Sequence, residues 1–205
     1  MEQQGWRFLT KRVFDRAAAA IGLGVTAPLI AATALAIRGA MGSPVLFTQE
    51  RPGLGGRVFR LYKFRTMSAK ASPCGELLPD AQRLTRLGSF LRATSLDELP
   101  QLLNVLRGEL SLVGPRPLLT RYLERYTPEQ MRRHQVMPGI TGWAQVNGRN
   151  ANDWATKLSY DVWYVENWSL MLDFRILALT IVRVLNRTGV SREGHATMPE
   201  FVGAS

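Results

Sequence analysis

The chain has very few of the residues that build disulfides or soft-metal sites. Its 205 residues include one cysteine, Cys74, and two histidines, His134 and His195. A single cysteine excludes an internal disulfide, and nothing in the sequence argues for an oxidising compartment. Two scattered histidines are too few for a zinc site. We therefore expect any bound metal to be a hard cation held by carboxylates.

Acidic residues and lysines are also scarce. The chain has 16 acidic and 26 basic residues, which gives a formal net charge of +10. Only four of the basic residues are lysines, and the other 22 are arginines. Arginine favours bidentate contact with phosphate or carboxylate, although codon bias in a GC-rich genome would produce the same excess. With 46% hydrophobic residues, the chain is long enough for one folded domain with an appendage.

One long stretch, Ala17–Ile37, contains no formal charge. As a straight helix it would be about 31 Å long, close to the roughly 30 Å hydrocarbon core of a bilayer. Pro28 lies near its middle, and the part from Ala17 to Ala27 is only about 16 Å long, roughly one leaflet. The stretch therefore predicts either a membrane span or a helix broken at Pro28 that enters one leaflet and returns.

The charges at the two ends of this stretch favour re-entry. Arg7, Lys11, Arg12 and Arg16 precede it, so the positive-inside rule keeps the N-terminus in the cytoplasm. A true span would export the rest of the chain, whereas re-entry keeps Arg38 on the same face as the cations that precede the stretch. A signal peptide is disfavoured because no clear cleavage pattern follows. A buried pair of soluble helices remains the alternative.

The remaining sequence predicts an α+β fold that is mainly helical. Val45–Gln49 and Val58–Phe64 flank a glycine-rich loop and predict a β-hairpin. Six helices are expected after it: 83–92, 97–107, 119–126, 128–135, 153–166 and 170–186. The last has an apolar stripe that suits either core packing or an amphipathic interfacial helix docked on a membrane.

Two adjacent carboxylates, Asp97 and Glu98, stand out in this basic chain. Leucines recur around them at helical spacing, and within a helix Pro100 is tolerated only in the first turn. The helix should therefore begin at about Leu96 or Asp97, with both acids at its N-terminal end. A simple alternative is that the acids complement the helix dipole, with Ser95 and Glu98 forming a capping box.

Three short segments present arginine in constrained settings. Lys63 and Arg65 alternate along a predicted strand and should project from the same face. Arg116 lies between two prolines, which lowers the entropy cost of aiming its guanidinium, and Arg149 follows a glycine. Each alone could be a solvated surface cation. Together with the acidic pair they predict a site for a diphosphate bridged by Mg²⁺.

At this point the sequence resembles the bacterial sugar transferases called monotopic phosphoglycosyl transferases, in what looks like their minimal form. The resemblance extends from Lys11 to about Thr188 and is specific because six motifs occur in order. These motifs are Lys11–Asp15, the proline Pro28 within the apolar stretch, Lys63–Met67, Leu96–Gln101, Leu112–Pro117 and Val146–Asn150.

The resemblance implies a reaction that neither composition nor spacing supplies. Such an enzyme moves a sugar-1-phosphate from a UDP-sugar to a polyprenyl (undecaprenyl) phosphate and releases UMP, as the first membrane step of surface glycan assembly. It implies Mg²⁺ dependence and a two-step covalent route. Asp97 matches the nucleophile, and Glu98 matches an acidic partner that helps to bind metal or to activate the lipid phosphate.

The resemblance also implies roles for residues outside the acidic pair. Lys63, Arg65, Arg116 and Arg149 match residues expected around the phosphates or the nucleotide, and Asp161 matches a further acidic position near them. The resemblance implies a helix break at Pro28. Many relatives have serine before that proline, whereas this chain has Ala27, so the depth and angle of the kink are open.

The resemblance also sets the expected organisation. Residues 1–40 would form the re-entrant membrane helix with its basic flank, residues 41–190 a catalytic domain on the cytoplasmic face of the bacterial inner membrane, and residues 191–205 a C-terminal tail. A homodimer is compatible with the resemblance. No nucleic-acid partner is expected, because no recognised binding module is present. The alternative function is a non-catalytic basic membrane adaptor.

Overall fold

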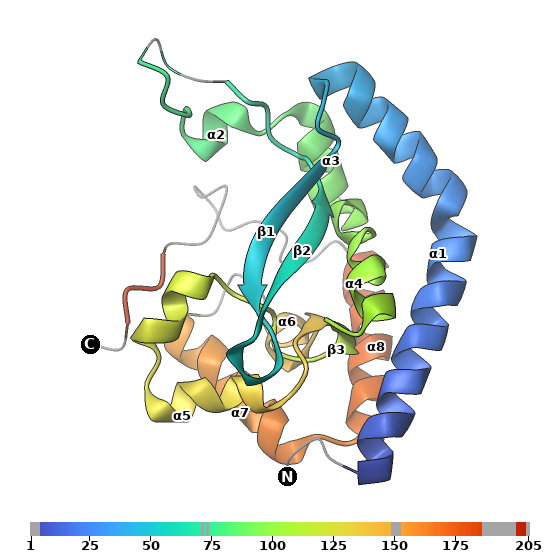
Figure 1. The fold of residues 1–205 in the computed structure, drawn as a ribbon, viewed down its shortest axis with the longest axis vertical. Coiled ribbons are helices and arrows are strands. Elements are labelled where there is room, and N and C mark those ends of the chain that lie inside the picture. Colours follow the sequence, from blue (N-terminus) through green and yellow to red (C-terminus); the bar gives the residue numbers. More distant parts are fainter. Residues whose placement is uncertain (1–4, 71, 73, 149–152, 186–199, 204–205) are drawn as a thin grey trace.

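Helix α1 (Gly5–Met41) is the longest element and contains the whole apolar stretch. The computed structural model describes residues 5–70, 72, 74–148, 153–185 and 200–203. Pro28 lies inside α1 and the helix continues through it, so the predicted division into two helices is not seen. Proline removes one backbone hydrogen bond and can bend a helix without ending it. Figure 1 shows α1 bowed along one edge of the protein, and re-entry into one leaflet stays a prediction.

Many apolar side chains of α1 face away from the rest of the protein. Ile21, Val25 and Leu35 are 67%, 76% and 73% exposed. Within the described ranges α1 alone is long and apolar enough to cross a membrane, and only 11% of its most apolar window is buried. A core helix would hide such side chains. This exposure argues against a buried pair of soluble helices and favours contact with lipid.

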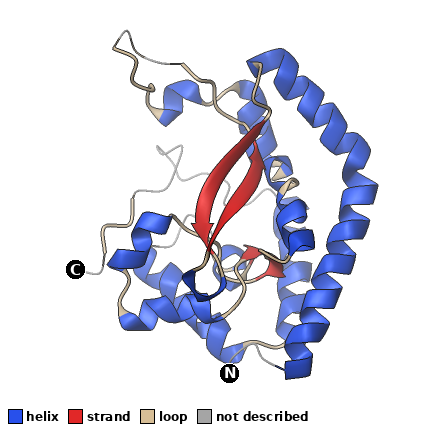
Figure 2. Ribbon diagram, viewed as in Figure 1, coloured by secondary structure: helices blue, strands red, loops and turns tan. Residues whose placement is uncertain are grey.

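Strands β1 (Leu46–Pro52) and β2 (Val58–Phe64) form the predicted antiparallel hairpin. Figure 2 shows it as a narrow ribbon among helices. A short 3-10 turn, η1 (Leu54–Gly56), connects the strands, and both of its glycines have positive φ, which glycine adopts without steric cost. Lys63 therefore lies near the end of the hairpin that is away from the turn.

Short helical segments follow the hairpin. They are α2 (Asp80–Arg83), α3 (Arg86–Ala93), the 3-10 turn η2 (Leu96–Glu98) and α4 (Gln101–Arg107). The first predicted helix is thus divided between α2 and α3, where Thr85 caps α3 by accepting a hydrogen bond from the Gly88 N–H. A Cβ on Gly88 would lie 1.8 Å from the Thr66 carbonyl oxygen, so the glycine permits α3 to pack against the exit of β2.

A second sheet, which the sequence analysis missed, pairs β3 (Ser111–Val113) with β4 (Gly139–Thr141) in parallel. The backbone segments that follow the two strands approach each other so closely that only glycine fits at two positions. A Cβ on Gly114 would lie 2.1 Å from a backbone oxygen of the facing segment, and one on Gly142 would lie 2.1 Å from the Gly114 oxygen. This contact fixes the start of the loop 114–117 that carries Arg116.

The C-terminal half consists of short turns followed by two longer helices. The elements are η3 (Thr120–Arg125), α5 (Pro128–Met131), η4 (Arg132–Gln135), α6 (Trp143–Val146), α7 (Trp154–Asn167) and α8 (Leu170–Leu185). The predicted helices 153–166 and 170–186 are therefore confirmed as α7 and α8. The predicted helix 119–126 is a 3-10 segment, and the predicted helix 128–135 consists of α5 and η4.

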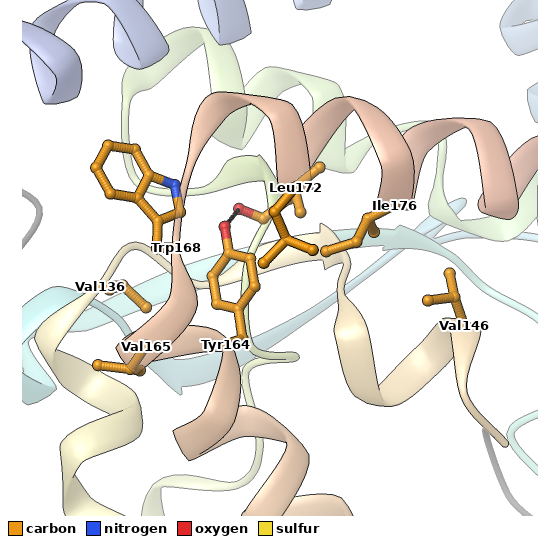
Figure 3. Packing of buried hydrophobic residues seen from close by; sticks show 8 residues of the cluster. Val136, Val146, Tyr164, Val165, Trp168, Leu172 and Ile176 are labelled. Carbon is orange, nitrogen blue, oxygen red and sulfur yellow. Dashed lines mark hydrogen bonds between the residues drawn. The ribbon is translucent and has the colours of Figure 1, made fainter. Parts of the chain in front are cut away.

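The largest buried cluster joins α7 and α8 to the parallel sheet. Its members are Val113, Val136, Val146, Tyr164, Val165, Trp168, Leu172 and Ile176 (Figure 3). The core interpretation of the apolar stripe is thus confirmed for Leu172 and Ile176. Met171 and Ile181 on the same helix are 77% and 62% exposed, so interfacial docking of that outer face stays a prediction.

A buried polar network fastens the start of α1 to this core. The Lys11 ammonium is 2% exposed and lies 2.5 Å from the Asp173 carboxylate, whose two oxygens also accept hydrogen bonds from Tyr164 and Trp168. Asp15, one turn further along α1, accepts a hydrogen bond from Ser111 at 2.7 Å. Burying these charges is tolerable only because each is paired. The apolar helix α1 is therefore joined to the domain at its N-terminal end by buried ion pairs and hydrogen bonds.

Residues near the C-terminus also pack on the domain. Phe201 is 3% exposed and lies among Tyr122, Tyr126 and Trp154, and its N–H donates to the Tyr122 hydroxyl at 3.1 Å. Glu200 forms ion pairs with two arginines of η3. This part of the expected tail, residues 200–203, is thus placed against η3, whereas residues 186–199 lie outside the described residues.

Candidate active site

The acidic pair lies in the 3-10 turn η2, just before α4. Ser95 has φ 57° and ψ 16°, a left-handed conformation, and its side chain makes no capping hydrogen bond. The predicted capping box is therefore wrong, and α4 begins at Gln101 with Pro100 as its N-cap residue. The left-handed Ser95 interrupts the helical path between α3 and η2. The turn η2 packs against β2, and its first residue, Leu96, packs in a cluster with Ile37 of α1, so the acids lie between the hairpin and the apolar helix.

Glu98 brings together two of the predicted cations. The Lys63 ammonium, from the end of β2, donates to Glu98 Oε1 at 2.7 Å, and the Arg116 guanidinium donates to the same oxygen at 2.6 Å. Burial alone would raise the pKa of Glu98, but the charges and hydrogen bonds of Arg116 and Lys63 outweigh it and hold that pKa well below its usual range. Glu98 is therefore ionised at neutral pH.

Asp97 occupies a different environment from its neighbour. It is 8% exposed, and burial followed by the charge of Glu98 raises its pKa to about 6, against the opposing effect of Lys63 and Arg116. Consecutive residues of a helical turn point in different directions. Two adjacent carboxylates with their pKa values pushed apart suit two chemical roles rather than one shared role.

The structure places Arg65 away from this pair. Its guanidinium donates hydrogen bonds to the backbone carbonyls of Met41 and Pro44, at the end of α1 and in the linker that follows. The expectation that Arg65 and Lys63 project together from one strand face is wrong, because β2 ends at Phe64. Arg149, the fourth predicted cation, lies outside the described residues.

Asp161 is found in a buried ion pair with a residue that the sequence analysis missed. Its Oδ2 accepts hydrogen bonds from Arg133 Nε at 3.0 Å and Nη2 at 2.7 Å, and the two residues are 4% and 2% exposed. Arg133 Nη2 also donates to the backbone carbonyl of Arg116 at 2.6 Å. Nothing in the sequence distinguishes Arg133 from the basic residues beside it, because its burial depends on the packing of η4 against α7.

The carboxylates fit a magnesium ion that is bound together with substrate. Among the described residues there is no group of three or more His, Cys, Asp or Glu side chains that could hold a metal. Mg²⁺ keeps several water ligands and is often held by one or two carboxylates together with substrate phosphates. Asp97 and Glu98 would supply two such carboxylates, and Lys63 and Arg116 would supply charge for the remaining phosphate oxygens.

The family model described as bacterial sugar transferase matches residues 6–187. The chain belongs to the bacterial sugar transferase family. This match confirms the resemblance that the ordered motifs indicated.

Relatives of this bacterial sugar transferase cover most of its length. It is 55% identical over 196 residues to the uncharacterized sugar transferase EpsL of Bacillus subtilis (strain 168), and this match covers 96% of this chain and 97% of the relative. It is 44% identical over 189 residues to the UDP-glucose:undecaprenyl-phosphate glucose-1-phosphate transferase of Caulobacter vibrioides, covering 86% of this chain and 70% of that protein. The protein of the same name from Xanthomonas campestris pv. campestris is 41% identical over 198 residues, and the match spans 91% of this chain but 41% of that protein.

Proposed function

We propose that this protein transfers a sugar-1-phosphate from a UDP-sugar to undecaprenyl phosphate and releases UMP. The arrangement that carries the proposal is the acidic pair of η2, with Glu98 held by Lys63 and Arg116, directly before α4, which packs against the apolar helix. A water-soluble diphosphate and a lipid phosphate could both reach such a place. The names of the Caulobacter and Xanthomonas relatives support the same general reaction.

In the first step Asp97 acts as the nucleophile. A carboxylate oxygen of Asp97 forms a bond to the sugar-bearing phosphorus, and the bond from that phosphorus to the bridging oxygen breaks. UMP leaves with the bridging oxygen and its electron pair, and an aspartyl phosphosugar remains. Such an intermediate divides one difficult displacement into two easier ones. A pKa of about 6 leaves Asp97 mostly ionised at neutral pH, as a nucleophile must be.

In the second step an oxygen of undecaprenyl phosphate attacks the same phosphorus. The bond to Asp97 breaks, the carboxylate is regenerated and the lipid diphosphosugar is released. Lys63 and Arg116 neutralise phosphate charge in both steps, and Glu98 holds their head groups in place. Mg²⁺, held by Asp97 and Glu98, would supply further charge neutralisation when bound.

The proposal includes a location and a topology. The catalytic domain lies on the cytoplasmic face of the bacterial inner membrane, where UDP-sugars occur, and α1 enters the bilayer without crossing it. The exposed apolar surface of α1 and the basic residues before and after the apolar stretch support this arrangement. Single cysteines near residues 3 and 60, labelled in intact cells with an impermeant thiol reagent, test it: labelling of only one site contradicts re-entry.

The reaction is tested with the full-length purified protein in detergent or nanodiscs. We expect UMP release in the presence of Mg²⁺, undecaprenyl phosphate and one member of a panel of UDP-sugars, and no release after chelation with EDTA. Absence of UMP release with every sugar would contradict the proposed reaction. A non-catalytic adaptor, by contrast, would retain its function in the variant Asp97→Asn.

A further inference from the structure

Arg51, in β1, is a half-buried cation that the proposed mechanism does not use. Its Nε is buried and has no hydrogen-bond partner in the described part of the chain, and one terminal nitrogen donates to the side chain of Gln49 at 2.7 Å. No carboxylate of a described residue lies within ion-pair distance of it. A half-buried guanidinium without a counter-charge is costly unless a ligand supplies the negative charge.

The pairing of the hairpin places Arg51 on the same face as Lys63. Arg51 pairs with Phe59 and Lys63 pairs with Phe47, and directly paired residues of antiparallel strands point to one side. Phe59 and Lys63 are four residues apart, and alternate residues of a strand share a face. The backbone positions of the two residues are therefore about 13 Å apart along the strand, but both have long side chains with head groups near Arg116.

Arg116 connects the two ends of this face electrostatically. Burial and then the nearby charge of Arg116 lower the pKa of Arg51 to about 10, which leaves Arg51 charged at neutral pH. The same Arg116 is hydrogen-bonded to Glu98 beside Lys63. Glu98 already accepts hydrogen bonds from both Lys63 and Arg116, so its single negative charge does not also neutralise Arg51. Three cations, Arg51, Arg116 and Lys63, thus lie close to the two carboxylates of Asp97 and Glu98, which leaves an excess of positive charge that an anion with more than one phosphate group complements.

We propose that Arg51 is the binding residue for the second phosphate of the nucleotide-sugar, the one that departs as UMP. The inference rests on the proposed function, because it assigns the sugar-bearing phosphate to the end of the face with Lys63 and Asp97. The guanidinium holds the UMP phosphate while the bridging bond breaks, and it stabilises the charge that the leaving group gains. Arg116 lies between the two phosphates and contacts the bridge.

The surroundings of Arg51 favour the nucleotide over the lipid as the source of this phosphate. The turn η1 packs against η4, and β1 packs against η3, where Tyr122 and Tyr126 lie close enough to affect the pKa of Arg51. Figure 1 shows α1 along the opposite edge of the molecule from α5, which follows η3. A lipid phosphate would approach from α1, whereas Arg51 lies at the end of the hairpin that packs against η3 and η4.

The test measures direct binding of two probes by calorimetry in nanodiscs. UMP and farnesyl phosphate are titrated separately into the full-length protein and into the variants Arg51→Gln, Arg51→Lys and Arg60→Gln. Arg60 is a matched control because it lies on the opposite face of the same hairpin and is exposed. Thermal unfolding of each variant is measured alongside.

We expect Arg51→Gln to weaken UMP binding by about 10- to 100-fold, as loss of a charge-assisted contact does. Arg51→Lys should recover part of that loss, and Arg60→Gln should change nothing. Farnesyl phosphate should bind equally to all four proteins. Unchanged UMP affinity in Arg51→Gln, no UMP binding by the wild type, or a selective loss of farnesyl phosphate would overturn the inference. If Arg51→Gln does not fold, an equal UMP affinity of Arg51→Lys and wild type overturns it.

These measurements are independent of turnover. A wild type that binds UMP through Arg51 but releases none from any UDP-sugar would contradict the proposed reaction and leave the phosphate site standing. If both the wild type and Arg51→Gln turn over normally, the phosphate site at Arg51 is contradicted and the proposed reaction stands.

Discussion

Arg133 donates a 2.6 Å hydrogen bond to the backbone carbonyl of Arg116, while the Arg116 side chain is held by Glu98. Arg133 is itself fixed by two hydrogen bonds to Asp161. The ion pair thus acts on the site through the backbone that carries Arg116. The structure provides a partner for Asp161 inside the protein, and its expected place beside the substrate stays a prediction.

Asp161 is expected to act as a positioning residue. Asp161→Asn leaves the Arg133 charge buried without a counter-charge and loosens the Arg116 loop, so kcat for UMP release should fall by about 10- to 100-fold, the scale of one misplaced charged group. The KM for the UDP-sugar should change less. Asp161→Glu should restore part of the rate.

The matched control for Asp161 is Glu166, on the same helix. It forms an exposed ion pair with Arg132 at 2.8 Å, and exposed pairs contribute little. Glu166→Gln should therefore leave kcat unchanged. If Asp161→Asn lowers the melting temperature but leaves kcat, measured below that temperature, at the wild-type value, the residue has a purely structural role.

Glu98 is expected to hold the two cations as well as serve the chemistry. Glu98→Gln keeps the shape of the side chain but replaces two charge-assisted hydrogen bonds with weaker ones, and it leaves Lys63 and Arg116 to repel each other. We expect UMP release to fall by at least about tenfold and the melting temperature to decrease. Glu50→Gln, an exposed position on the same hairpin, is the control. Wild-type stability in Glu98→Gln would show that the cations do not depend on it.

The pairing of Lys11 with Asp173 predicts a large effect far from the acidic pair. Asp173→Asn removes the nearer of the two carboxylates beside the buried Lys11 ammonium, at 2.5 Å against 3.8 Å for Asp15, so we expect the protein to lose about 3 kcal/mol of stability. Thermal unfolding in detergent measures this. The control is Glu129→Gln, which breaks an exposed pair with Arg132. Equal melting temperatures of the two variants would contradict the role of the network in fixing α1.

His134 predicts a pH-dependent part of the stability. Burial, followed by the charge of Arg133, lowers its pKa to about 4, whereas the unfolded chain takes up the proton near pH 6.5. The stability that its neutral form provides is therefore complete above about pH 6.5 and is lost as the pH falls toward 4, up to about 3 kcal/mol. The difference in melting temperature between wild type and His134→Gln should shrink over this range. A constant difference would contradict the assignment.

Local patterns in the sequence predicted the elements that position the acidic pair. Strand alternation located the hairpin, and helical periodicity located α4, α7 and α8. The motifs also named Lys63 and Arg116, which the structure brings within hydrogen-bond distance of Glu98 from 35 and 18 positions away. Short-range patterns suffice here because each of these residues lies at the end of a regular element or beside a proline.

Features that depend on distant packing could not be predicted. Lys11 and Asp173 are 162 positions apart, and each looks like an ordinary surface charge until both are buried. The parallel strands β3 and β4 are three residues long, too short for any periodicity to show. The left-handed Ser95 has no signature in the sequence, and it moved the start of α4 beyond both acids.

The central claim is that Asp97 becomes covalently bonded to a phosphosugar. The most direct measurement is intact-protein and peptide mass spectrometry after the protein is mixed with its UDP-sugar and Mg²⁺ without lipid acceptor and quenched in acid. We predict a mass increase of one phosphosugar on the peptide that contains Asp97, its loss on adding undecaprenyl phosphate, and its absence in Asp97→Asn. Turnover by Asp97→Asn, or a wild type that turns over without this adduct and binds donor and acceptor together, would contradict the account.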